Sequence, residues 1–132
     1  MRYHLDTDFL VFALSARGPE HTRLEELAGS DAVIEISSIA WYEFCRGPRT
    51  PAQLVVARSF FGDEGIVAFN EPLAERAAEE FRRLGSPRRR AADVAIGVVA
   101  ERRDAVLLTR NAGDFADVEG LRVEGAASGT TR

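Results

Sequence analysis

Short apolar segments typical of β-strands alternate with segments of helical spacing along almost the whole chain. Residues 105–108 have the clearest strand pattern, while Leu73, Ala77 and Phe81 recur at the spacing of a buried helix face. This order of elements favours a parallel sheet with helices on both faces and right-handed crossovers. A chain of 132 residues fits one domain with a substantial core. We therefore predict a single α/β domain.

Turn and cap residues divide the chain into the expected elements. Strands are expected at residues 2–6, 32–36, 65–69, 105–108 and 121–123. Helices are expected at residues 9–14, 20–28, 70–84 and 91–103, after a cap at Ser37 or Ser38, and after a capping box at Thr50. The ending lacks apolar anchors, so we predict a domain over residues 1–124 and a flexible C-terminal tail over residues 125–132.

Four carboxylates follow predicted strands or stand in neighbouring helices, namely Asp6, Glu43, Asp93 and Asp114. The carboxyl ends of adjacent parallel strands converge on one crevice, so these acids are expected to meet there. Crowded acids repel one another, and a bound cation would keep them ionised. Oxygen ligands without sulfur or a nearby histidine favour hard ions such as Mg²⁺ or Mn²⁺. The pattern therefore indicates metal-assisted chemistry on phosphates.

Each acid also has an ordinary structural explanation. Asp6 can cap a helix, Glu43 can face solvent, and Asp93 lies in a first helical turn where negative charge is favourable. Asp114 stands three residues after Asn111, the spacing of a helix cap pair. The joint placement of the four acids at one end of the sheet is what favours a functional interpretation.

The composition excludes several other functions. All 17 basic residues are arginine, and without lysine or a glycine-rich motif the chain has no Walker-type phosphate loop. A formal net charge of −4 argues against a purely electrostatic DNA-coating protein. We expect no membrane segment and no secretory signal, and the lone Cys45 agrees with a reducing cytoplasm.

Together these segments resemble a PIN domain, specifically the VapC-type toxin ribonucleases of prokaryotic toxin–antitoxin pairs, over nearly the full length. The most specific part is Ala-Asp-Val-Ala-Ile at residues 92–96, followed by the strand and Thr-Arg-Asn-Ala-Gly-Asp-Phe at residues 109–115. Leu-Asp-Thr at residues 5–7 is similar to the first-acid motif of the family, and residues 38–43 to the second. The resemblance implies a three-layer α/β/α sandwich around a mostly parallel sheet.

The resemblance also implies roles for particular residues. The predicted catalytic acids, which would bind Mg²⁺ or Mn²⁺, are Asp6, Glu43, Asp93 and Asp114. Thr109 would orient the acids and Asn111 would brace the same loop. The family often has asparagine two residues after the first acid. This chain has Asp8 there, which could help to hold a metal or a nearby water, and Asp117 competes with Asp114 for any metal role.

The implied reaction is hydrolysis of RNA by a metal-activated water, leaving a 5′-phosphate and a 3′-hydroxyl. Neither His4 nor His21 lies in a motif suited to 2′-hydroxyl attack. Because arginine clamps phosphate, we predict RNA-binding roles for Arg46, Arg110, Arg88, Arg89 and Arg90, although the last three also fit a solvated loop. The resemblance further implies a VapB-like antitoxin covering the cleft and a homodimer, with apolar helix surfaces near Leu24 or Phe60-Phe61 available for either contact.

Two alternatives remain open. The chain could be a non-catalytic PIN-like module that binds RNA or protein through the same cleft. It could also be a haloacid-dehalogenase-like phosphohydrolase that uses Asp6 as nucleophile and Asp8 as acid/base. That class usually relies on a lysine, which is absent here, and on a longer chain.

Overall fold

The computed structural model describes residues 1–15 and 17–126. Its centre is a five-stranded sheet with the order β3-β2-β1-β4-β5, in which each neighbouring pair is parallel. The strands are β1 (Arg2–Leu5), β2 (Val33–Ser37), β3 (Ile66–Val67), β4 (Val106–Leu108) and β5 (Arg122–Glu124). The prediction of a parallel α/β domain is confirmed.

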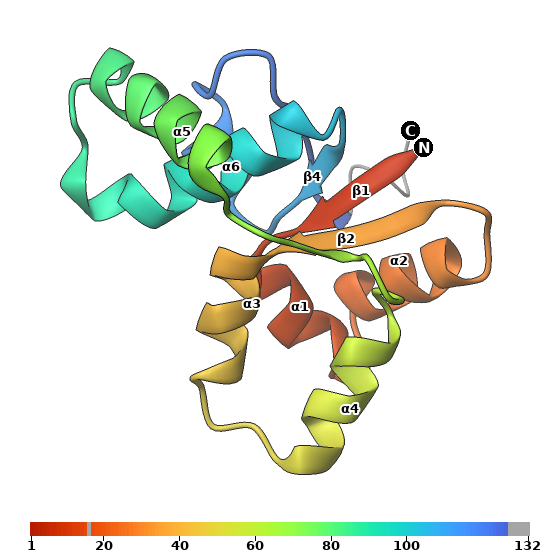
Figure 1. Ribbon diagram of the computed structural model, residues 1–132. Coiled ribbons are helices and arrows are strands. Elements are labelled where there is room, and N and C mark those ends of the chain that lie inside the picture. The colour runs from red at the N-terminus through yellow and green to blue at the C-terminus, as the bar shows by residue number, and fades with distance from the viewer. Residues whose placement is uncertain (16, 127–132) are drawn as a thin grey trace.

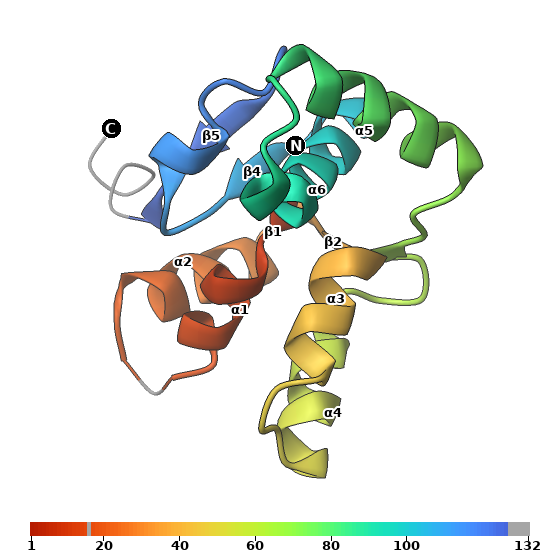
Figure 2. The same ribbon diagram turned by 90° about the vertical axis from the view of Figure 1, so that its left-hand side faces the viewer.

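Helices cover both faces of the sheet (Figure 1 and Figure 2). On one side lie α1 (Thr7–Ala13), α2 (Pro19–Ala28), α3 (Ser38–Cys45) and α4 (Pro51–Ser59). On the other side lie α5 (Glu71–Arg83) and α6 (Ala91–Arg102). Two short 3₁₀ helices, η1 (Arg88–Arg90) and η2 (Ala112–Phe115), precede α6 and β5. This arrangement is the predicted three-layer sandwich.

Side-chain caps fix where several helices begin. The hydroxyl of Ser37, not that of Ser38, accepts the N–H of Ala40 at 3.1 Å and starts α3. Thr50 and Gln53 form the predicted capping box at the start of α4. Each such bond satisfies a backbone N–H that the helix itself leaves without a partner.

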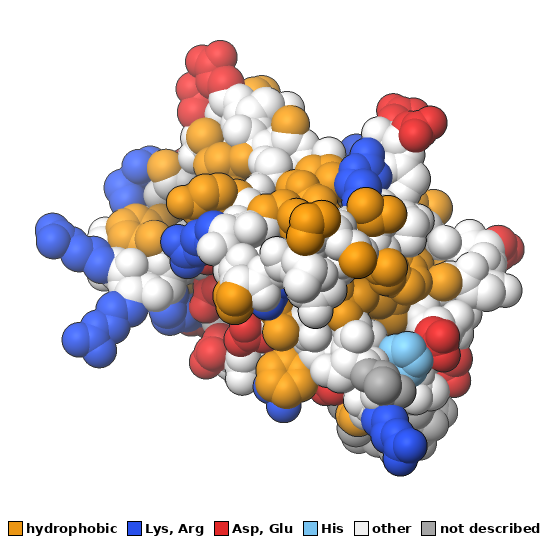
Figure 3. Space-filling view, turned by 90° about the horizontal axis from the view of Figure 1, so that it is seen from below, with side chains coloured by type: hydrophobic (Ala, Val, Ile, Leu, Met, Phe, Trp, Pro, Cys, Tyr) orange, Lys and Arg blue, Asp and Glu red, His pale blue; other side chains and the backbone are white. Residues whose placement is uncertain are grey.

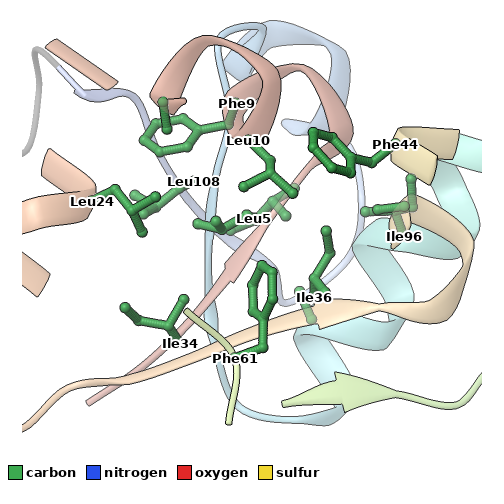
Figure 4. Close-up of a cluster of buried hydrophobic side chains, with 14 of the residues drawn as sticks. Leu5, Phe9, Leu10, Leu24, Ile34, Ile36, Phe44, Phe61, Ile96 and Leu108 are labelled. Carbon is green, nitrogen blue, oxygen red and sulfur yellow. The ribbon is translucent and has the colours of Figure 1, made fainter. Parts of the chain in front are cut away.

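The main core lies between the sheet and the layer formed by α1, α2, α3 and α4. Figure 4 shows large side chains from these elements packed together, and the buried set includes Leu5, Phe9, Leu10, Leu24, Ile36, Phe44 and Leu108. Alternate residues of β2 point into this core, which matches the two-residue period of a strand. Fully burying each of these side chains contributes roughly 1.5–3 kcal/mol.

The intervening strand residues His4 and Glu35 are also buried, and they form a charged network with the end of α6. Glu35 lies 2.7 Å from the His4 ring and accepts hydrogen bonds from Arg2 and Arg103, each at 2.6 Å to Oε2. Burial alone would raise the pKa of Glu35, but the bonds from His4 and Arg103 outweigh it and lower that pKa to about 2. The network therefore keeps a buried carboxylate ionised.

The strand register brings the ends of β1 and β4 together. Leu5 is paired with Leu108, and the N–H of Asp6 donates to the carbonyl of Leu108 at 3.1 Å. The residue after β1 and the residue after β4, Asp6 and Thr109, therefore begin side by side at the carboxyl edge of the sheet.

Part of the predicted C-terminal tail can be placed. Ala126 is buried against the main core, so the ordered chain continues past residue 124. Residues 127–132 lie outside the described residues. Within residues 1–15 and 17–126, no helix has the length and apolar character needed to cross a membrane.

The apolar contact surface expected near Leu24 or Phe60-Phe61 stays a prediction. The side chains of Leu24 and Phe61 are themselves buried in the core, and Phe60 is half-buried. Figure 3 shows hydrophobic side chains gathered on the lower face, and the strongly exposed apolar residues include Tyr42 in α3 and Val55 and Val56 in α4. Leu24 is buried because α2 packs against α1 and β2.

Candidate active site

The four predicted acids line a single cleft of about 360 Å³ at the carboxyl edge of the sheet. Asp6 follows β1, Glu43 lies on α3, Asp93 lies in the first turn of α6, and Asp114 lies in η2. The lining also includes Asp8 and Asn111 from the predicted set, together with Thr7, Arg46 and Arg49. Residues far apart in the sequence thus meet where the parallel strands end.

Asp6 is the most buried of the four acids and is held by two hydrogen bonds. Its Oδ1 accepts the N–H of Phe9 at 2.8 Å, which caps α1, and its Oδ2 accepts the hydroxyl hydrogen of Thr109. Burial raises the pKa of Asp6 to about 6, the charges of Asp8 and Asp93 add to the increase, and the two hydrogen bonds reduce it. The carboxylate is therefore both fixed in position and costly to ionise.

Asp93 experiences the same crowding. Its side chain is half-buried, and burial raises its pKa. The negative charges of Glu43 and Asp114 raise the pKa of Asp93 further, while the positive charge of Arg90 opposes them. The acids therefore act on one another electrostatically as well as lining one cleft.

Glu43 has a partner that the sequence did not reveal. Thr7 donates its hydroxyl hydrogen to Oε1 of Glu43 at 2.6 Å, which joins the start of α1 to α3. The position of Thr7 beside Asp6 in the first-acid motif was the available signal, but its hydrogen-bond partner depends on the tertiary fold.

Thr109 connects the first acid to the loop of the fourth. While its hydroxyl donates to Asp6, the same oxygen accepts the N–H of Asn111 at 3.0 Å. Asn111 makes no side-chain cap in the described structure, and its carbonyl instead accepts the N–H of Asp114 at 2.9 Å. The expected cap pair is therefore replaced by a backbone turn that Thr109 holds in place.

Two of the five predicted RNA-binding arginines, Arg110 and Arg90, form intramolecular ion pairs. The guanidinium of Arg110 stacks 3.6 Å from the ring centroid of Phe12 and lies 3.5 Å from Glu20, outside the cleft lining. Arg90 forms a two-point ion pair with Asp117, and neither side chain lines the cleft. The RNA-binding roles of Arg110 and Arg90 stay predictions.

The remaining arginines divide between the cleft and the surface. Arg46 lines the cleft as predicted, and Arg49, which the sequence analysis missed, lies beside it. Arg49 stacks 4.6 Å from the ring centroid of Phe44, and Arg46 stacks 5.4 Å from that of Tyr42. Arg88 and Arg89 are exposed in η1. The cleft therefore has two positive side chains at its rim beside its acids.

The acids line the cleft without forming a closed cage. In the described part of the chain, no three His, Cys, Asp or Glu side chains are already gathered as a metal-binding cluster. The donor set is nevertheless suited to a hard divalent cation, because all its ligands are oxygens and Mg²⁺ keeps several waters instead of requiring a full set of protein ligands. The raised pKa values of Asp6 and Asp93 identify the two carboxyls that such an ion would help to ionise.

The parallel sheet and the acidic cleft at its carboxyl edge define the class of this protein. It is an α/β protein whose ligand site lies where the strands end. Within that class, the model of the PIN domain family matches residues 3–121, and the chain belongs to this family. A search of curated protein sequences finds no match.

Solved structures agree with this fold. The chain is similar to VapBC2 from Rickettsia felis bound to promoter DNA, with a TM-score of 0.73, 22% identity, and coverage of 95% of this chain and 98% of that one. DNA-bound VapBC from Salmonella typhimurium gives a TM-score of 0.72, 23% identity, and coverage of 96% and 98%. A toxin–antitoxin complex from Klebsiella pneumoniae gives a TM-score of 0.71, 26% identity, and coverage of 94% and 97%.

Proposed function

We propose that this protein is the toxin of a toxin–antitoxin pair and that it cleaves RNA as a metal-dependent endoribonuclease. The observation that carries the proposal is the convergence of Asp6, Glu43, Asp93 and Asp114 on one cleft. Family membership and the toxin–antitoxin complexes among the structural neighbours support the same function.

The acids would hold Mg²⁺ or Mn²⁺. When bound, such an ion lowers the pKa of a water and stabilises negative charge on the attacked phosphate. Thr109 fixes the Asp6 carboxylate, and Thr7 fixes that of Glu43, so that both are oriented before any ligand arrives. Asp8 adds a further negative charge at the cleft, where it would assist in holding the ion or a water near it.

The substrate phosphate would be held by the two rim arginines. Arg46 and Arg49 place guanidinium groups on the same cleft as the acids, and arginine binds phosphate oxygens through charge-assisted hydrogen bonds. Aromatic side chains under both guanidiniums restrict their motion, which reduces the entropy lost on binding. Arg88 and Arg89 remain candidates for contacts farther along the RNA.

The proposed partner is a small VapB-like antitoxin. Two of the three compared structures are VapBC complexes and the third is a toxin–antitoxin complex, and this chain covers at least 97% of each matched chain. We propose that the antitoxin covers the acidic cleft and that the toxin forms a homodimer. A single cysteine, Cys45, supports a reducing compartment such as the cytoplasm.

The direct test is incubation of the purified protein with total RNA and either Mg²⁺ or Mn²⁺, with a chelator control and mapping of the product ends. We expect cleavage that leaves 5′-phosphates, requires the ion, and is lost in Asp93→Asn. Binding of RNA without cleavage would instead support a non-catalytic module. Hydrolysis of phosphomonoesters without RNA cleavage would support the dehalogenase-like alternative, which membership of the PIN family already disfavours.

A further inference from the structure

The segment that carries Asp114 is tied to the rest of the molecule by four polar attachments within six residues. Arg90 contacts the carbonyl of Asp114 and the side chain of Asp117. Arg83 contacts the carbonyl of Asp117, and Glu80 accepts the N–H of Glu119. We call this set of contacts, made by Glu80, Arg83 and Arg90 to residues 114–119, the loop clamp.

Arg90 makes the contacts closest to the cleft. Its Nη1 and Nη2 donate to the two carboxylate oxygens of Asp117 at 2.9 Å and 2.6 Å, and Nη2 also donates to the carbonyl of Asp114 at 2.8 Å. A guanidinium bound at three points fixes both the position and the orientation of the peptide that bears the fourth acid.

Glu80 anchors the other side of the clamp from α5. Although it is fully buried, Glu80 accepts two hydrogen bonds from Arg83, and its Oε2 also accepts the N–H of Glu119 at 2.9 Å. The same Arg83 donates to the carbonyl of Asp117 at 2.7 Å. A buried carboxylate with this many partners is rigid, and α5 packs closely on α6, which carries Asp93.

Apolar packing also holds this segment. Phe115 and Val118 already bury apolar side chains and hold the segment against the core. The Arg90–Asp117 pair is partly exposed, at 30% of the Arg90 side chain and 49% of the Asp117 side chain, and such ion pairs contribute modestly to folding. Asp114, whose carbonyl Arg90 contacts, is exposed in the short 3₁₀ helix η2, directly after Gly113.

We propose that Arg90 and Glu80 are positioning residues that hold the segment 114–119 so that the Asp114 carboxylate stays in the acidic cleft. This inference depends on the proposed function, because it assigns Asp114 a share in binding the divalent ion. The chain thus uses a helix on the outer layer to set the position of one acid in the cleft.

The test measures Mn²⁺ affinity by electron paramagnetic resonance on the full chain, without RNA. Asp117→Ala removes the carboxylate partner of Arg90 but leaves the positive charge of Arg90 in place. Arg90→Gln removes both that charge and the contacts that the guanidinium makes. We expect both to weaken Mn²⁺ binding about ten-fold, as for other residues that orient metal ligands. Arg82→Gln, an exposed arginine on α5, serves as the matched control and should bind Mn²⁺ normally.

A double-variant comparison separates positioning from general electrostatics. Asp114→Asn alone should weaken Mn²⁺ binding, and adding Asp117→Ala should weaken it no further, because the clamp acts through Asp114. An equal additional loss in the Asp114→Asn background, or unchanged affinity in Asp117→Ala, would overturn the proposal.

Hydrogen exchange distinguishes failure of the clamp from failure of the proposed function. If the unaltered protein binds no Mn²⁺, the metal-dependent function is wrong, and the clamp is judged by exchange at residues 114–119. Faster exchange there in Asp117→Ala, Arg90→Gln and Glu80→Gln than in Arg82→Gln supports the clamp. Unchanged exchange would contradict it.

Discussion

Thr7 donates a hydrogen bond of 2.6 Å to Glu43 across 36 positions of sequence. The bond joins the helix that follows the first acid to the helix that carries the second. It therefore fixes the separation of two acids that no shared element of secondary structure connects.

Replacing Thr7 by valine should keep its shape while removing this bond. We expect Mg²⁺-dependent RNA cleavage to fall about ten- to a hundred-fold, as is typical when a residue that orients a metal ligand is lost. The free energy of unfolding should fall by only about 1 kcal/mol. Thr22→Val, which removes an exposed hydroxyl bond on α2, is the matched control and should cleave RNA normally. Equal cleavage by the two variants would contradict the role of Thr7.

As pH falls from 7.5 to 5.5, the metal-free protein should gain stability relative to its Asp6→Asn variant. Burial raises the pKa of Asp6 to about 6 in the fold, against an ordinary value of 3.8, so the folded state binds this proton more tightly. The stabilisation from proton binding at Asp6 is fully present below pH 3.8 and is lost as pH rises through 6. The gain between the two pH values should be about 1 kcal/mol, measured by thermal denaturation in chelator.

Two comparisons check this assignment. Asp6→Asn should lack this contribution, and Mg²⁺ at pH 7.5 should stabilise the unaltered protein more than Asp6→Asn. Burial lowers the pKa of His4 and raises that of Asp93, but both groups are present in the two proteins, so their effects cancel in the comparison. Glu35 and Glu80 have pKa values of about 2 and titrate below this pH window. An equal change of stability with pH in the two proteins would contradict the assignment to Asp6.

Glu35→Gln should destabilise the fold without weakening metal binding. The substitution removes the charge that pairs with Arg2 and Arg103 in a buried network, which typically costs about 3 kcal/mol. Because the folded pKa of Glu35 is about 2, its stabilisation is present above the ordinary glutamate pKa of 4.5 and is lost as pH falls toward 2. Urea denaturation should show a smaller difference in the free energy of unfolding between the unaltered protein and Glu35→Gln at pH 3 than at pH 7. The Mn²⁺ affinity of Glu35→Gln should equal that of the unaltered protein, which serves as the control.

Arg49→Gln should weaken RNA binding, whereas Arg110→Gln should not. Only Arg49 lines the cleft, while Arg110 is stacked on Phe12. Loss of one phosphate contact should reduce the slope of log affinity against log salt by about 0.7 for single-stranded RNA. Binding should be measured with chelator present so that no cleavage occurs, and Arg102→Gln on the far end of α6 provides a further control. Equal losses in Arg49→Gln and Arg110→Gln would reject this assignment.

The sequence was sufficient to predict the sheet and the meeting of the acids. Alternating elements imply parallel strands, and parallel strands place Asp6 and the loop after β4 at one edge without any knowledge of side-chain contacts. Cap residues were equally informative, because the Thr50 capping box depends only on neighbours three positions apart.

Contacts between distant side chains were not predictable in this way. The run at residues 88–90 looked uniform, yet only Arg90 turns toward Asp117, and that depends on how η1 meets the loop after η2. Arg49 reaches the cleft because the chain turns after α3, which its sequence neighbours do not specify. Leu24 was assigned to a helix face correctly, but the amphipathic pattern could not show that this face was already covered.

Asp6 couples the proposed metal site of this protein to its architecture, because one oxygen of the carboxylate caps α1 while the other accepts a hydrogen bond from Thr109, the residue after β4. A lineage that lost the proposed activity would still need a capping oxygen at this position, since a hydrophobic replacement would remove the cap of the helix. Loss of the activity should instead begin at Asp114 or Glu43, and an inactive descendant should retain aspartate or asparagine at position 6 after those acids have changed.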